Sequence, residues 1–165
     1  MFKAAIFDMD GVMVDTEHIQ SRAFEIILSE LGITAKKTKH GTVHVAGGTT
    51  HKIWDTLKKQ YHFDADTEEL IKKKRVMVLN VIRQGIEPLP GLLDLLADLQ
   101  GREISLAIAT SAQKERAELI TEKIGVGKHF TVTITANDVI NVKPAPDVYL
   151  KAAELLGVRP ADCIV

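Results

Sequence analysis

The sequence lacks several features that would restrict where this protein acts or what it binds. Its single cysteine, Cys163, cannot form an intramolecular disulfide bond, which favours a reducing compartment. Its 21 basic and 22 acidic residues leave a formal net charge of -1, so charge does not predict nucleic acid or an anionic membrane as a partner. No run approaches the roughly 18 apolar residues of a membrane span, and no separate signal-type segment follows Met1-Phe2-Lys3. We therefore expect a soluble, cytoplasmic protein.

The composition is that of a globular protein that can bury a core. Hydrophobic residues make up 45% and charged residues 26% of the 165 residues, which is ordinary for this class. The length allows one domain, or one domain with an insertion. The sequence contains neither an internal repeat nor a low-complexity tract.

Short apolar runs alternate with amphipathic helices in the second half of the chain. Together with a first apolar run at 4–7, this pattern predicts strands at 105–109, 132–135 and 163–165, and helices at 92–99, 114–124 and 147–156. Strands that alternate with helices indicate a parallel sheet in an α/β domain.

The first predicted strand is separated from the others by residues 16–84, which read as helical throughout. We therefore predict an α/β fold: a Rossmann-like parallel sheet core formed by residues 1–15 and 85–165, with an all-helical cap domain inserted at 16–84. In open parallel sheets, ligands bind outside the carboxyl ends of the strands. Polar residues at those ends are the candidates for a functional site.

Two carboxylates, Asp8 and Asp10, directly follow the first predicted strand, and Gly11 comes next. Residues two apart in extended backbone project to the same side, so the two carboxylates can converge on one point. Close carboxylates repel each other, which usually implies a bound cation or a shared proton, and oxygen ligands of this kind suit Mg²⁺. The same pattern also fits an acidic turn at a strand end.

Two further polar features fall at the same predicted edge: Thr110-Ser111 after the second strand and Lys143 after the third. If the substrate is a phosphate, an aspartate can attack it and form an aspartyl-phosphate. A hydroxyl, backbone N–H groups and a lysine can hold the phosphoryl oxygens. Taken singly, Thr110-Ser111 also fits a helix N-cap and Lys143 a solvated loop lysine. Their joint placement favours the phosphate site.

The ordered set of motifs resembles the haloacid dehalogenase superfamily, in particular its phosphatase and phosphomutase branch with a helical cap inserted after the first strand. The resemblance covers almost the whole chain. It is carried by Phe7-Asp8-Met9-Asp10-Gly11-Val12, Asp15-Thr16-Glu17, Pro88-Leu89-Pro90-Gly91, Ala109-Thr110-Ser111 and Lys143-Pro144-Ala145-Pro146-Asp147.

The resemblance implies a role for each matching residue. Asp8 would be the nucleophile and a Mg²⁺ ligand, while Asp10 would be the general acid/base and would give its backbone carbonyl to the metal. Thr110 would hold the phosphoryl group, helped by the backbone at Ser111. Lys143 would balance charge between the nucleophile and the phosphate.

The chain departs from the family's pattern at its end. The family has a fourth, acidic motif after the next core strand, which completes the Mg²⁺ site, and the sequence stops at Val165 as that strand begins. Asp162 precedes the strand, at its wrong end. We expect a longer parent protein, the alternative being a weakened metal site that uses more water.

The predicted cap contains one candidate substrate-binding loop and one run of basic residues. A glycine pair in Gly47-Gly48-Thr49-Thr50 lets the backbone approach a ligand, and the resemblance implies that Gly48 and Thr49 contact the leaving part of the substrate. The alternative is a flexible turn with a helix cap. Lys72-Lys73-Lys74-Arg75 reads as a solvated basic helix face, together with Lys58 and Lys59.

These features predict an enzyme: a Mg²⁺-dependent, haloacid dehalogenase-like phosphoric monoester hydrolase. Its substrate would be a small phosphorylated metabolite such as a sugar phosphate. One alternative is a β-phosphoglucomutase-like phosphotransferase, which would need a second anion site, ideally a bidentate arginine. The other is a non-catalytic phosphate-binding module. Neither the substrate nor the oligomeric state follows from the sequence.

Overall fold

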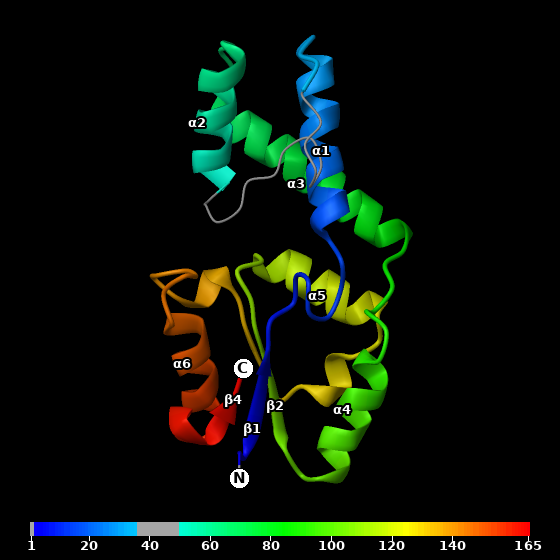
Figure 1. Ribbon diagram of the computed structural model, residues 1–165, viewed down its shortest axis with the longest axis vertical. Helices are drawn as coiled ribbons and strands as arrows, with labels where there is room; N and C mark the ends of the chain where they lie inside the picture. The colour runs from blue at the N-terminus through cyan, green and yellow to red at the C-terminus, as the bar shows by residue number, and fades with distance from the viewer. Residues whose placement is uncertain (1, 36–49) are drawn as a thin grey trace. The chain divides into compact units, whose positions relative to one another are not determined.

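The computed structural model describes residues 2–35 and 50–165 of the chain (Figure 1). Its residues divide into two compact units. We call Met1–Asp15 with Ile82–Val165 the core unit, and Thr16–Val81 the helical unit. Each is described by itself.

Within the described residues, the core unit holds one parallel sheet of four strands in the order β3-β2-β1-β4. The strands are β1 (Ala4–Phe7), β2 (Ser105–Ala109), β3 (Val132–Ile134) and β4 (Cys163–Ile164). In the sequences AAIF and SLAIA, small and branched apolar residues follow one another without polar alternation, as expected for strands covered on both faces. The predicted α/β fold with a parallel sheet is confirmed.

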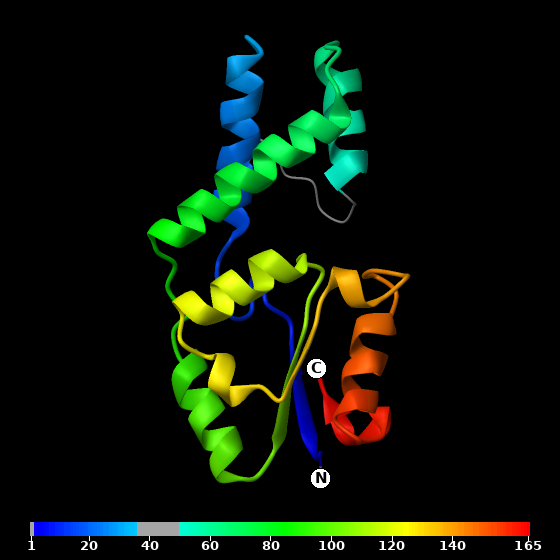
Figure 2. The same ribbon diagram turned by 180° about the vertical axis from the view of Figure 1, so that it is seen from behind.

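Helices cover both faces of this sheet. Figures 1 and 2 show α6 on one side and α4 on the other. The helices of the core unit are α4 (Leu92–Gly101), α5 (Lys114–Lys123) and α6 (Asp147–Leu155), with 3₁₀ turns η1 (Gly127–His129), η2 (Ala136–Asp138) and η3 (Pro160–Asp162). Residues Val148, Ala152 and Ala153 of α6 form one buried cluster with Ile6 and Ala107. Their spacing places the apolar stripe of α6 against one face of the sheet.

The helical unit contains α1 (Glu17–Glu30), α2 (Thr50–Tyr61) and α3 (Thr67–Gln84), the last of which runs on into the core unit. Its core includes Phe24, Leu28, Trp54 and Leu57. The rings of Phe24 and Trp54 lie 4.8 Å apart between centroids, and Trp54 is fully buried. No helix among the described residues is long and apolar enough to cross a bilayer.

Lys74 contradicts the prediction of a fully solvated basic face on α3. Its side chain is buried, donates to Oε1 of Gln20, and lies over the ring of Phe24 with Nζ 4.5 Å from the centroid. A lysine stem can pack along apolar surface while an acceptor and an aromatic face satisfy the ammonium. A run of four basic residues does not reveal which member turns inward.

Candidate active site

A tight loop at the carboxyl end of β1 presents Asp8 and Asp10. The carbonyl of Met9 accepts bonds from the backbone N–H groups of Met13 and Val14 at 2.9 and 3.2 Å, and the N–H of Gly11 donates to the carbonyl of Val14 at 2.8 Å. Gly11 has a φ of 77°, a conformation that favours glycine. Because Met9, Met13 and Val14 are fully buried, the loop is anchored and its two carboxylates start from a fixed backbone.

Lys143 connects Asp8 to the neighbouring strand. Its Nζ lies 2.9 Å from Oδ1 of Asp8 and donates to the carbonyl of Ala109, the last residue of β2, at 2.8 Å. The ammonium also lies 4.6 Å from the ring centroid of Tyr149. The side chain is only 18% exposed, so the structure excludes a solvated loop lysine.

The hydroxyl of Thr110 lies in a buried turn rather than at a helix start. Thr110 is fully buried, its N–H donates to the carbonyl of Ile134 at 2.9 Å, and its Oγ1 accepts from the N–H of Ala112 at 3.1 Å. The N-cap of α5 is Gln113, which excludes the alternative of Thr110-Ser111 as that cap. Ser111 is exposed.

The pairing of β1 with β2 brings these features to one edge. Phe7 lies opposite Ile108 in the parallel register, so the residues that follow each strand meet at the carboxyl end of the sheet. Asp8, Asp10, Lys143 and the turn at Thr110 all belong to this edge. Gly48 and Thr49 lie outside the described residues, so they stay predictions.

Arg116 is a site residue that the sequence analysis missed. Its Nη2 lies 2.7 Å from Oδ2 of Asp10, and its side chain is 18% exposed. Arg116 lies in the first turn of α5, the helix that follows Thr110-Ser111. A cation in a first helical turn is unfavourable for the helix dipole, but Lys114 at the start of α5 carries the same signal, so the sequence did not single out Arg116.

The donor set at this corner is chemically suited to Mg²⁺. The side chain of Asp8 can supply a carboxylate oxygen and the backbone of Asp10 a carbonyl oxygen, both hard ligands that suit Mg²⁺, and Mg²⁺ keeps several waters when the protein gives it few ligands. In residues 2–35 and 50–165, no three His, Cys, Asp or Glu side chains gather into a metal-binding group. Asp8 and Asp10 are therefore candidate ligands of a water-rich site.

The loop after β3 is braced by a capping box. Thr135 donates its backbone N–H and its hydroxyl to Oδ2 of Asp138 at 2.8 and 2.6 Å, and the Thr135 hydroxyl accepts from the N–H of Asn137. The hydroxyl bond from Thr135 holds the pKa of the Asp138 carboxyl below its usual value, against the opposing effect of burial. This box supports the segment that leads to Lys143.

Replacing Asp138 with alanine should lower the free energy of unfolding by about 1 kcal/mol at neutral pH, because capping hydrogen bonds are worth about that much. A carboxyl whose pKa is lowered in the folded state stabilises above its unfolded pKa and loses that effect as pH falls through the folded pKa. Urea unfolding at several pH values should therefore show the gap between wild type and D138A closing in acid. A difference in unfolding free energy that stays the same at low pH would contradict stabilisation by the ionised carboxylate of Asp138.

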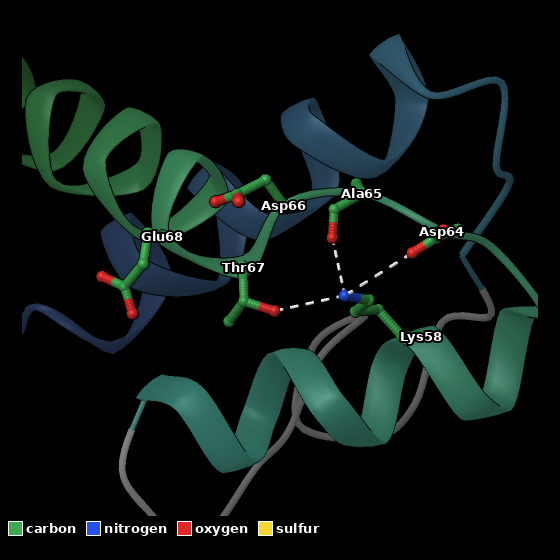
Figure 3. A pocket seen from close by; sticks show the side chains of 6 residues that line it. All are labelled: Lys58, Asp64, Ala65, Asp66, Thr67 and Glu68. Carbon is green, nitrogen blue, oxygen red and sulfur yellow. Dashed lines mark hydrogen bonds and ion pairs between the residues drawn. The ribbon is translucent and has the colours of Figure 1, made fainter.

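The helical unit contains a hollow of about 550 Å³ (Figure 3). Lys58 ties it together, since its Nζ donates to the carbonyl of Ala65 at 2.6 Å and to Oγ1 of Thr67 at 3.2 Å. The lining residues are Lys58, Asp64, Ala65, Asp66, Thr67 and Glu68. Three carboxylates oppose binding of a phosphate there, so we read Lys58 as a brace between α2 and α3.

The core unit is a parallel α/β sheet with two carboxylates and a lysine at the carboxyl ends of its strands. In such sheets ligands bind at this edge, so the fold and the site place the chain among the α/β enzymes that act there. The family model described as "Haloacid dehalogenase-like hydrolase" matches residues 5–165, and the chain belongs to this family. This confirms the predicted haloacid dehalogenase-like hydrolase, and its curated relatives include proteins named as phosphatases.

Two curated relatives and one solved structure illustrate the similarity. The fructose-1-phosphate phosphatase YqaB of Escherichia coli is 29% identical over 164 residues, which cover 99% of this chain and 85% of the relative. The phosphorylated carbohydrates phosphatase of Thermotoga maritima is 27% identical, with 99% and 74% covered. The β-phosphoglucomutase structure from Clostridium difficile, 24% identical with a TM-score of 0.80 over 99% of this chain and 74% of that one, shares the fold.

Proposed function

We propose that this chain is a Mg²⁺-dependent phosphatase of a small phosphorylated metabolite of the sugar phosphate type, acting through an aspartyl-phosphate on Asp8. The observation that carries the proposal is the position of Lys143, whose Nζ lies 2.9 Å from Oδ1 of Asp8 and 2.8 Å from the carbonyl of Ala109. A cation held between a nucleophilic carboxylate and the end of the next strand can bind the oxygens of a phosphoryl group. The names of the two curated relatives support the choice of substrate class.

The reaction would proceed in two displacements. In the first, an oxygen of Asp8 bonds to phosphorus while the bond to the leaving alcohol breaks, and Asp10 gives its proton to the leaving oxygen. In the second, water attacks the phosphorus of the aspartyl-phosphate, Asp10 takes the proton of that water, and inorganic phosphate leaves. Asp8 and the proton on Asp10 are then restored.

The remaining site residues would bind and orient the phosphoryl group. Thr110 and the backbone at Ser111 would donate to its oxygens, and Lys143 would offset its charge next to Asp8. When bound by Asp8 and the backbone carbonyl of Asp10, Mg²⁺ supplies further neutralisation and orientation of the transferring group. The assignment of residues 16–84 as a cap, and of Gly48 and Thr49 as substrate contacts, stays a prediction.

A panel of sugar phosphates tests this function directly. The product of the complete reading frame that contains this chain should release inorganic phosphate in the presence of Mg²⁺. Removal of the metal with EDTA should lower the rate at least about tenfold, since the metal stabilises charge in the transition state, and added Mg²⁺ should restore it. Binding of phosphate or sugar phosphates with no Asp8-dependent release would favour the non-catalytic binding module.

The rival function is a β-phosphoglucomutase-like transfer to another sugar oxygen. The shared fold of the C. difficile enzyme keeps this candidate open, but a mutase needs a second anion site. No arginine occurs between Arg22 and Arg75, so the bidentate contact best suited to a second phosphate is missing from most of residues 16–84. Assay with β-glucose 1-phosphate discriminates, because isomerisation faster than phosphate release would overturn the hydrolase assignment.

A further inference from the structure

Arg116 differs from the other arginines whose ion pairs the structure shows. In the other pairs the arginine side chain is 51–80% exposed, as at Arg22, Arg83, Arg102 and Arg159. The side chain of Arg116 is 18% exposed and its partner Asp10 is 34% exposed. A pair shielded in this way is less screened by solvent than an exposed pair, so its geometry is held more firmly.

The location of Arg116 in α5 gives a second, independent reason to look for a role. Arg116 lies in the first turn of this helix, where the dipole disfavours a cation. Its backbone N–H donates to the carbonyl of Gln113 at 3.0 Å, so the main chain there is in place. The guanidinium therefore reaches Asp10 from a fixed helical start, a few residues after the turn at Thr110.

We propose that Arg116 is a positioning residue that sets the orientation of the Asp10 carboxylate for proton transfer. This role rests on the proposed function, in which Asp10 is the general acid and base. A carboxylate is planar, so holding Oδ2 with Nη2 of Arg116 at 2.7 Å fixes the direction of the other oxygen. The anchored loop around Met9 fixes the backbone of Asp10. Together the two constraints hold the proton-carrying group in one geometry.

The chemistry of the leaving group separates this role from a general structural one. An alkoxide leaves poorly unless it receives a proton as the bond to phosphorus breaks, whereas nitrophenolate leaves without one. The second displacement is the same for both substrates, so the comparison is made on kcat/KM, which reports the steps through the first displacement. Misplacing Asp10 should therefore lower kcat/KM strongly for a sugar phosphate and weakly for p-nitrophenyl phosphate. General acid catalysis contributes about 10²-fold or more, and misplacement can remove most of it.

Arg116→Met should lower kcat/KM for a sugar phosphate on the order of 10²-fold, with less than about threefold loss of kcat/KM for p-nitrophenyl phosphate. Arg116→Lys should recover part of the loss, because a cation is restored without the planar fork. Arg83→Met is the matched control: Arg83 pairs with Glu115 of the same helix turn at 3.6 Å, and its loss should change neither rate by more than about twofold.

An Asp10→Asn background supplies the decisive comparison. If Arg116 acts through Asp10, adding Arg116→Met to Asp10→Asn should leave the residual rate on either substrate nearly unchanged, because coupled residues are not additive. Equal losses of kcat/KM on both substrates, or full additivity with Asp10→Asn, would overturn the positioning role. Circular dichroism and thermal unfolding of each variant identify any loss of folded protein. If Arg116→Met does not fold, the same two comparisons are made with Arg116→Lys.

Failure of the proposed function gives a different result. If wild type hydrolyses neither substrate, or if hydrolysis survives Asp8→Asn, the phosphatase proposal falls and the role of Arg116 falls with it. If Asp8-dependent hydrolysis is present but Arg116→Met matches wild type on the sugar phosphate, only the positioning role is overturned.

Discussion

Replacing Asp8 with asparagine should lower phosphate release from a sugar phosphate by at least about 10⁴-fold, the scale seen when a covalent nucleophile is removed. The change is nearly isosteric, so the loop from Met9 to Val14 should keep its backbone bonds. Asparagine is neutral and cannot form the acyl phosphate, which removes the first displacement entirely. Phosphate release under saturating substrate, with Mg²⁺ present, measures the loss.

Two controls distinguish loss of the nucleophile from misfolding. Asp98→Asn removes a carboxylate that pairs with Arg102 on the exposed face of α4, and its rate should match wild type within about twofold. Acid-quenched wild type should carry one phosphoryl group on the peptide containing Asp8, and Asp8→Asn should carry none. A phosphorylated peptide elsewhere, or residual rates close to wild type, would show that Asp8 is not the nucleophile.

Replacing Lys143 with methionine should lower kcat/KM by about 10²–10³-fold, the usual cost of removing one charge-stabilising donor from a transition state. Methionine keeps most of the side-chain volume, so packing against Tyr149 is largely retained. What is lost is the ammonium between Asp8 and the carbonyl of Ala109. Initial rates over a range of substrate concentrations separate the effect on KM from that on kcat.

Lys151→Met is the matched control for Lys143. Lys151 lies on α6, and its Nζ donates to the carbonyl of Asp138 at 2.5 Å. The same chemical change there should cost some stability and less than about threefold in rate. Equal losses in the two variants would mean that Lys143 acts by bracing the fold and not by contacting the phosphoryl group.

The architecture was readable from the sequence because its signals are local. Apolar runs such as Ala4 to Phe7 and Ser105 to Ala109 predict buried strands, and the helices between them repeat their apolar positions every three to four residues. The alternation then requires parallel crossovers, which bring the carboxyl ends of the strands to one edge. Asp8, Thr110 and Lys143 could be assigned to that edge on this basis.

Arg116 and Lys74 show why other features could not be read in the same way. The partner of Arg116 is Asp10, more than a hundred residues earlier in the chain. Lys74 belongs to a run of four basic residues, and only the packing of α3 against Phe24 turns this one inward. Charge pattern along a helix tells which residues are basic, whereas burial and pairing depend on the neighbouring elements.

By itself, the sequence determined the parallel α/β core, the family, and the positions of Asp8 and Asp10 after β1, because each follows from residue order and short-range periodicity. The resemblance implied Lys143 next to the nucleophile, and the structure gives the 2.9 Å contact with Asp8. Only the tertiary structure decided that Arg116 holds Asp10. Both ion pairs join segments far apart in the chain, and their distances are set by how the loop after β1 packs against the loop before α6 and against α5. The sequence named the two carboxylates and Lys143, and only the fold brought Arg116 to Asp10, because that contact depends on packing between distant elements.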